Sequence, residues 1–423
     1  MADDPISRFQ AHAGQPPEQA RFFWTGGPVD VAERTWFASY FSGVTAFETD
    51  DGLVLVDAGM ARLGPMLAGA VRQKTAAPVH TAVYTHGHVD HAYGLPAFLS
   101  PDQPRPRVVG HRNMPARFAR YGATQGHNRA LNARQFGGTV EAAGASDAYD
   151  TFHAPILAPD VLYDDTLTLE VGGVTFELHH AMGETDDHTW VYCPARGVLC
   201  PGDLFMWAVP NAGNPQKVQR YPWAWAKALR EMAEARPRTL CPGHGGPVVD
   251  RPDEIQRMLL ETADYLDAIV ERTLRAMEDG SPPHVDIVRA VDVPRSESPW
   301  LQPIYDDGEF IVRNVIRHFG GWYSGRPSEL RPAARDAVAR EIARAAGGAL
   351  ALADRARAIA ASGDLPLACH LADHALEADP ADVAIQRIVA ELYEARAAAE
   401  PSLMAVNLFR SAAAYARAGR PFR

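Results

Sequence analysis

Four potential metal ligands stand within six residues, in the string THGHVDH: His86, His88, Asp90 and His91. Zinc prefers imidazole nitrogens, and a carboxylate beside them suits zinc, iron or manganese. The string follows an apolar, β-branched run at 81–85 that predicts a strand. Side chains two residues apart leave a strand on the same face. His86 and His88 are therefore expected to reach one ion together, while Asp90 and His91, in the turn that follows, reach a second ion.

Three later segments carry the further groups that a site for two ions needs. Asp203 follows a predicted strand and a glycine turn in LCPGDLFMW, where a carboxylate can bridge two ions. His244 has the same setting in LCPGHGGPV. The polar stretch HHAMGETDDHTW offers His179, His180, Glu184, Asp186, Asp187 and His188. Turns of this kind are often purely structural, but all the segments together favour a metal site.

The elements that must position these groups change character along the chain. Up to about residue 250, runs typical of strands alternate with loops and helices, at 35–49, 53–57, 81–85, 174–178 and 190–193. A loop-rich insertion at about 117–160, which carries His127 and His153, has the length of a lid or binding segment. We divide the chain into a catalytic domain, 1–252, and a helical domain, 253–423.

The second half of the chain predicts helices. Apolar residues recur at helical spacing from about 252, and the sequence is rich in alanine from 331 onward. Residues 361–399 are typical of a helix–turn–helix unit of the tetratricopeptide type, with its turn at Asp379–Pro380. One such unit cannot bury its own apolar face, so it must pack on a neighbour or on a second subunit.

Composition narrows the function further. The 423 residues have a formal net charge of −11, which argues against a nucleic-acid partner. No long apolar run predicts a membrane span, and the N-terminal sequence lacks the pattern of a secretion signal, so we expect a cytoplasmic protein. The four cysteines are too scattered for a disulfide framework and are expected to be free thiols.

The order of these motifs resembles the metallo-β-lactamase superfamily: H-x-H-x-D-H, then an acidic segment after glycine, then P-G-D and P-G-H. The resemblance implies an αββα sandwich with a site for two zinc ions, or iron or manganese, at one edge. By position, the implied ligands are His86 and His88 for the first ion, Asp90, His91 and His244 for the second, and Asp203 as the bridge. Asp57 resembles the buried aspartate that fixes the tautomer of the ligand histidines.

The sequence departs from the superfamily at the third histidine. Where P-G-H-T is usual, this chain has Met182, Gly183, Glu184 and Thr185. Glu184 is therefore the expected third ligand of the first ion. The alternative is that His179 or His180 supplies that ligand and Glu184 only stabilises a turn. Asp187 and His188 are expected to support the ligands rather than bind metal.

An acidic residue at that position is a feature of the zinc alkylsulfatase branch. The string VRNVIRHFGGWYSGRPSEL (312–330) is similar to the alkylsulfatase dimerisation domain, and PWAWAKAL (222–229) resembles a helix of the same family. Two departures stand against this likeness. Asp203 replaces a glutamate that is common in that branch, and no lipid-carrier-like segment follows. We therefore expect a shorter relative whose substrate need not be a long-chain alkyl sulfate.

The resemblance implies a homodimeric hydrolase of alkyl sulfate esters, with Asp90 and Asp203 as the catalytic carboxylates. Asn211, Asn214, Lys217 and Arg220 fall where that branch binds sulfate, although solvation at the surface is the more common role for any one of them. Nearby aromatic residues could line a pocket but more commonly belong to a core: Phe205, Trp207, Trp223, Trp225, Trp300, Trp322 and Tyr323. Hydrolysis of a lactone, thioester or phosphoester is the first alternative, and a non-catalytic scaffold that binds a partner protein is the second.

Overall fold

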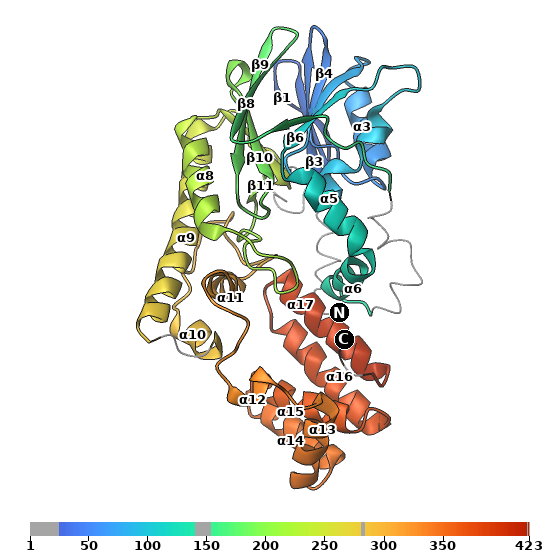
Figure 1. Ribbon diagram of the computed structural model, residues 1–423, viewed down its shortest axis with the longest axis vertical. Coiled ribbons are helices and arrows are strands. Elements are labelled where there is room, and N and C mark those ends of the chain that lie inside the picture. Colours follow the sequence, from blue (N-terminus) through green and yellow to red (C-terminus); the bar gives the residue numbers. More distant parts are fainter. Residues whose placement is uncertain (1–24, 140–153, 281–283, 421, 423) are drawn as a thin grey trace.

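The computed structural model describes residues 25–139, 154–280, 284–420 and 422 (Figure 1). Its strands are β1 (Gly26–Ala32), β2 (Thr35–Tyr40), β3 (Ser42–Thr49), β4 (Gly52–Val56), β5 (Val79–Val83), β6 (Arg107–His111), β7 (Val161–Tyr163), β8 (Thr166–Val171), β9 (Val174–Ala181), β10 (His188–Cys193), β11 (Val198–Met206) and β12 (Thr239–His244). Its α-helices are α3 (Gly64–Arg72), α4 (Val89–Ala92), α5 (Met114–Ala123), α6 (Gln125–Gln135), α8 (Pro222–Glu234), α9 (Pro252–Glu278), α10 (His284–Ala290), α11 (Gly308–Phe319), α12 (Pro327–Leu330), α13 (Arg335–Ala345), α14 (Ala349–Ala361), α15 (Leu365–Ala378), α16 (Val383–Ala398) and α17 (Leu403–Arg417). Two short 3-10 helices are η1 (Leu95–Phe98) and η4 (Pro194–Arg196).

Two sheets form the upper half of the molecule in Figure 1. One has the order β1-β2-β3-β4-β5-β6-β7, and the other has the order β12-β11-β10-β9-β8. Their inner faces enclose an apolar layer that includes Phe37, Phe47, Phe176, Leu178 and Val191. Strands with apolar residues on both faces must be covered on both sides. Helix α3 covers the outer face of the first sheet, and α8 and α9 cover the second. The predicted αββα sandwich is confirmed.

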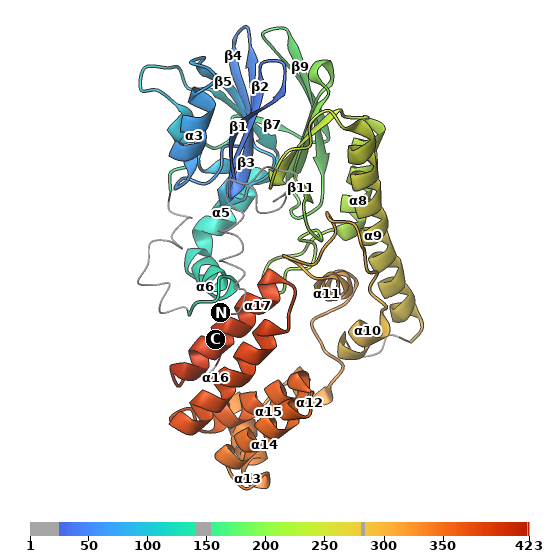
Figure 2. The same cartoon turned by 180° about the vertical axis from the view of Figure 1, so that it is seen from behind.

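The helical part forms the lower half of the molecule (Figure 2). Helices α13 to α17 enclose an alanine-rich core of their own. The predicted turn at Asp379–Pro380 separates α15 from α16 and is confirmed. Helices α9 and α11 instead share one core with α8 and the second sheet, through Trp225, Leu259 and Ile311. The division at residue 252 stays a prediction.

Two details differ from the sequence-based expectations. The run 35–49 is a hairpin of β2 and β3, because Phe41 adopts φ 75° and reverses the chain. The insertion at 117–160 is helical at its start, in α5 and α6, where alanine, arginine and glutamine favour a helix and Pro115 fits its first turn. His127 is exposed on α6, and His153 lies outside the described residues.

Other expectations concern the thiols and the membrane. All four cysteines are buried and free, as predicted: Cys193, Cys200, Cys241 and Cys369. Within the ranges described above, no helix has both the length and the apolar character needed to cross a bilayer.

Candidate metal centre

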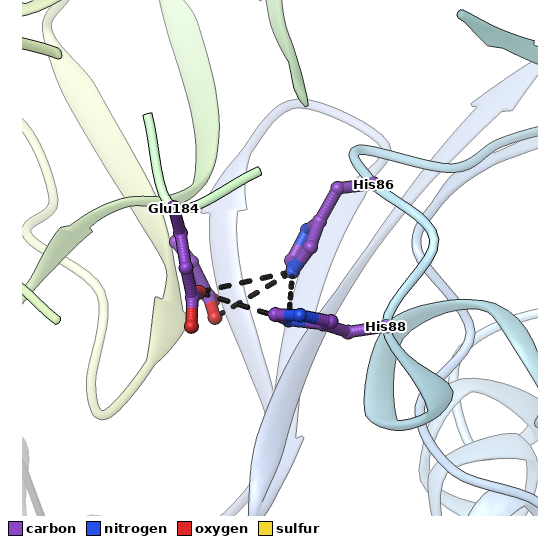
Figure 3. Close-up of side chains that lie close together, drawn as sticks. His86, His88 and Glu184 are labelled. Carbon is purple, nitrogen blue, oxygen red and sulfur yellow. Dashed lines mark hydrogen bonds and ion pairs between the residues drawn. The ribbon is translucent and has the colours of Figure 1, made fainter. Parts of the chain in front are cut away.

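One group of potential ligands gathers His86, His88, Glu184 and Asp203 (Figure 3). Nε2 of His86 lies 2.8 Å from Nδ1 of His88. Oε2 of Glu184 lies 3.9 Å from the first of these nitrogens and 3.7 Å from the second. Two ligands of a tetrahedral zinc ion lie about 3.4 Å apart, because each is about 2.1 Å from the metal. The group therefore has the donors and roughly the spacing of one zinc site.

A second group gathers Asp90, His91 and His244. Oδ2 of Asp90 lies 3.6 Å from Nε2 of each histidine. Asp203 connects the two groups. Its Oδ1 is 3.1 Å from Nε2 of His91, and its Oδ2 is 3.4 Å from Nε2 of His244 and 3.7 Å from Nε2 of His86. The structure thus brings together all seven predicted ligands, with Asp203 where a bridging carboxylate would stand.

Oε2 of Glu184 is buried and has no hydrogen-bond partner among the described residues, while the buried Nε2 of His91 and Oδ1 of Asp203 face each other at 3.1 Å. Leaving a buried polar atom without a partner costs about 1–3 kcal/mol. Glu184 and Asp203 are also two carboxylates buried side by side, which requires positive charge nearby. Divalent cations would satisfy both requirements, so the residues present fit the metal ions that the sequence predicts.

The ligands come from loops and strand ends rather than from the face of one strand. His86 and His88 lie in the loop after β5, which ends at Val83, so the expectation that strand alternation aligns them is wrong. Asp90 and His91 lie on the short helix α4 instead of in a turn. Gly87, between the two histidines, leaves room for Arg117 and Asp187, since a β-carbon there would lie 2.7 Å from Cδ of Arg117 and 2.9 Å from Oδ2 of Asp187.

Asp57 holds His91 from behind, as the resemblance implied. Its Oδ2 lies 2.8 Å from Nδ1 of His91, and its Oδ1 accepts the backbone N–H of Thr85 at 2.7 Å. Because Nδ1–H of His91 donates to Asp57, Nε2 is the ring nitrogen left to face the second group and to bind a metal ion. His244 is held likewise, with Nδ1 donating to the carbonyl of Phe41 at 2.6 Å. Phe41 turns the chain between β2 and β3 with a positive φ of 75°, so a strained backbone position lies next to this histidine.

The pKa values of the histidines differ between the two groups. Burial and neighbouring imidazoles lower the pKa of His86 well below its ordinary value, and burial and Arg117 do the same for His88. Both rings are thus neutral, which is the form that binds metal. In the second group, burial disfavours charge on His244, but Asp203 and Asp90 raise its pKa to about 9. A metal ion binding there must displace that proton.

Glu184, rather than a histidine of β9, completes the first group. The ring of His179 stacks on Trp190 at 3.9 Å. The ring of His180 stacks on His111 at 3.7 Å, and its Nε2 lies 3.1 Å from the carbonyl of Asp186. Neither histidine belongs to the group.

The polar residues after β11 are mostly buried, so their expected solvation at the surface is wrong. Asn211, Asn214 and Arg220 are 5%, 2% and 1% exposed. Nδ2 of Asn211 donates to Oε1 of Glu184, and Nη2 of Arg220 donates to the same oxygen at 3.1 Å. These two side chains therefore hold the predicted ligand. Nζ of Lys217 donates to Oδ1 of Asn132 on α6 at 2.7 Å.

Sequence reasoning missed a buried ion pair behind the two histidines. Nε of Arg117 donates to Oδ1 of Asp187 at 2.8 Å, and Oδ2 of Asp187 accepts the N–H of Gly87 at 3.0 Å. The pair holds the backbone between His86 and His88. Asp187 stood among the expected supporting residues, but its partner is 70 residues away and no local pattern marks it.

Most of the aromatic residues belong to the core, not to a pocket. Phe205, Trp207, Trp225 and Trp300 are buried in the layer between the second sheet and its helices. Trp223 packs on His318 and Phe319 of α11. Trp322 and Tyr323 are exposed beyond the end of α11.

Comparison with known proteins agrees with this architecture. Residues 41–244 match the metallo-beta-lactamase superfamily, and residues 284–419 match the alkyl sulfatase dimerisation domain. A linear primary-alkylsulfatase of Pseudomonas sp. is 24% identical over 79% of this chain, and an (R)-specific secondary-alkylsulfatase of Pseudomonas sp. is 25% identical over 90%. The chain spans 66% and 60% of the lengths of these two relatives.

Among solved structures, the stereoselective inverting sec-alkylsulfatase Pisa1 from Pseudomonas sp. aligns with a TM-score of 0.81 at 23% identity. That alignment covers 92% of this chain and 65% of the other. The likeness extends over both the sandwich and the helical part, so it concerns the order of the domains as well as each fold. This chain therefore carries a metallo-β-lactamase domain at 41–244, followed by an alkyl sulfatase dimerisation domain at 284–419.

Proposed function

We propose that this protein is a metal-dependent hydrolase of alkyl sulfate esters that holds two divalent ions, most simply zinc. The observation that carries the proposal is the pair of ligand groups joined by the buried carboxylate of Asp203. Similarity to two alkylsulfatases over 79% and 90% of the chain supports the sulfate ester as the substrate class.

The first ion would be held by His86, His88 and Glu184, the second by Asp90, His91 and His244, with Asp203 shared. Bound zinc supplies Lewis acidity, which lowers the pKa of water and neutralises negative charge on an ester. The open side of the site lies at His88, Asp90 and His244, whose side chains keep 15–19% exposure while the other ligands are buried. An ester therefore approaches from that side.

Side chains of the protein would accept the proton of the attacking water, bind the sulfate group and position Glu184. We assign to Asp90, on the open side, the role of accepting a proton from the attacking water with the carboxylate oxygen that does not face His91 and His244. Lys217 is the proposed sulfate ligand, because its Nζ has three N–H donors and, among the described residues, one of them is given to Asn132. Arg220 and Asn211, proposed as sulfate ligands from sequence, are instead proposed to act through Glu184, since both donate to its Oε1.

The proposal is tested on purified full-length protein whose metal content has been measured. Sulfate release from alkyl sulfates of several chain lengths is compared with hydrolysis of lactones, thioesters and phosphate esters. His86→Ala and Asp203→Ala should each lose bound metal and turnover. Lys217→Met should raise KM for sulfate esters only. Full activity in His86→Ala, or turnover of lactones alone, would contradict the proposal.

We also propose a homodimer formed through the helical part. Three large apolar side chains near the end of α11 are exposed: Phe319 by 53%, Trp322 by 75% and Leu330 by 53%. Light scattering of the full chain should give twice the monomer mass, and Trp322→Ser with Leu330→Ser should reduce it to one. A truncation near residue 255 is unsuitable as a test, because α9 and α11 share a core with α8.

A further inference from the structure

The loop of residues 211–220, which leads from β11 to α8, holds Glu184 from both of its ends. Asn211 at the start and Arg220 at the end donate to Oε1 of Glu184. Nε of Arg220 also donates to the carbonyl of Asn211 at 3.1 Å, which closes the loop on itself. With Oε1 engaged in this way, Oε2 remains for the group of His86 and His88.

Side chains of helix α11, in the helical part, form hydrogen bonds with the end of this loop. Nδ2 of Asn314 donates to the carbonyl of Arg220 at 2.9 Å, and the N–H of Arg220 lies 3.4 Å from Oδ1 of Asn314. Arg317, one helical turn on, donates from Nη2 to the same Oδ1 at 2.8 Å and from Nη1 to the carbonyl of Lys217 at 3.1 Å. Asn314 is 2% exposed, so its amide is committed to these contacts.

Asp306, the residue before the N-cap of α11, forms hydrogen bonds with the start of the loop. Oδ2 of Asp306 accepts the backbone N–H of Gly213 at 2.7 Å and that of Asn214 at 3.1 Å. Asp306 is fully buried. A β-carbon on Gly213 would lie 2.5 Å from the side chain of Phe310, so loop and helix are packed as closely as a glycine allows.

A loop without secondary structure needs such anchors, because fixing each residue of its backbone costs about 1–2 kcal/mol of conformational entropy. The anchors of the 211–220 loop come mainly from one element, α11 and its approach. Further contacts are with α6: Arg134 donates to Gln216 at 2.8 Å, Gln216 donates to the carbonyl of Leu131 at 3.2 Å, and Lys217 donates to Asn132. The position of Glu184 therefore depends on residues of the dimerisation domain.

We propose that Asn314 and Arg317 are positioning residues for the first metal ion. They fix the end of the 211–220 loop, and the loop fixes Glu184 through Arg220 and Asn211. This gives Asn314 and Arg317 of α11 a function inside their own chain, besides any part in dimerisation. The inference rests on the proposed function, because it presupposes that ions bind.

The test compares Arg317→Ala and Asn314→Ala with Arg313→Ala. Arg313 is the matched control, because it lies on the same helix, is 46% exposed and pairs only with Glu309 in the ion pairs of α11. Competition with a chromophoric chelator measures the affinity of each of the two ions. Circular dichroism of the metal-free proteins checks that each variant folds.

We expect the first ion, the one that Glu184 would hold, to be bound about tenfold more weakly in Arg317→Ala and in Asn314→Ala. A tenfold loss is the lower end of what is seen when a group that supports a metal ligand is removed. The second ion should keep its affinity, because its ligands are held by other segments, His91 by Asp57 and His244 by the carbonyl of Phe41. Arg313→Ala should match the wild type, and Arg317→Lys should recover part of the loss. The effect should fall on kcat more than on KM.

Two results would overturn the inference while leaving the proposed function intact: unchanged affinity for both ions, or equal weakening of both with a lower melting temperature of the metal-free protein. The second would mean that α11 acts on stability alone. A wild-type chain that binds no metal tightly would overturn the proposed function itself, and this inference with it.

Discussion

Replacing Asp57 by asparagine tests how strongly the buried aspartate supports the metal centre. Asparagine has the same shape and tolerates the positive φ of 61° at this position. Its Oδ1 can still accept the N–H of Thr85, but its Nδ2 donates and would face Nδ1 of His91. The change therefore removes one hydrogen bond to a charged group and releases the tautomer of His91.

A hydrogen bond to a charged group contributes about 1.5–3 kcal/mol. Because about 1.4 kcal/mol corresponds to a factor of ten in binding, the ion at His91 should be bound about 10- to 100-fold more weakly. The ion at His86 and His88 should change less, since Asp57 reaches His86 through the hydroxyl of Thr85, which donates to Oδ2 of Asp57 at 2.8 Å and lies 3.0 Å from Nδ1 of His86. Chelator competition on the two ions, read separately, measures both affinities.

Asp50→Asn is the matched control. Asp50 follows β3, is 79% exposed and pairs with Arg34, so its replacement should leave both ions at wild-type affinity. If Asp57→Asn binds both ions within about twofold of the wild type, the hydrogen bond to His91 does not support metal binding, and the reasoning from tautomer control is wrong.

Three further predictions follow from buried groups and close contacts. Burial and Arg220 lower the pKa of Lys217 to about 8, so KM for sulfate esters should rise above about pH 8 and should not do so in Lys217→Met. Burial raises the pKa of Asp373 from 3.8 to about 6, so the charged carboxylate destabilises the folded protein above pH 6 and has no such effect below about pH 4. Asp373→Asn should therefore raise the melting temperature at about pH 7.5 and leave it unchanged at about pH 4. A β-carbon on Gly243 would lie 2.1 Å from Oδ1 of Asp203, so Gly243→Ala should lose metal by elemental analysis, whereas Gly69→Ala, which meets no atom within 4 Å, should keep it.

The local part of the site could be predicted from sequence. The ligands His86, His88, Asp90 and His91 are adjacent, and Asp203 and His244 each follow a Pro-Gly pair at the end of a strand. Such residues can be recognised in a sequence because loops at strand ends project side chains to one edge of a sheet. Glu184 could be found by its place after Gly183, although the sequence alone left two histidines as alternatives.

The supporting contacts could not be predicted, because they join residues far apart. Arg220 and Asn314 are 94 residues apart, and nothing in either segment names the other. Asn211 and Arg220 were expected to be solvated because asparagine and arginine usually are. Their burial results from α11 covering the loop, which is a tertiary effect. The helices α5 and α6 were missed for a different reason, since glycines at 122 and 126 weaken the helical pattern there.

The contact between α6 and α17 has a consequence for how this chain acquires its structure. The hydroxyl of Ser411 on α17 donates to the carbonyl of Gly138 just after α6, across 273 residues of sequence. Closing so long a stretch of chain is slow compared with forming a helix or a hairpin. During synthesis, α6 is complete well before α17 has been made, so their contact forms only after nearly the whole chain has emerged. The α6 segment therefore stays incompletely packed for most of synthesis, which is the stage at which partly folded chains aggregate.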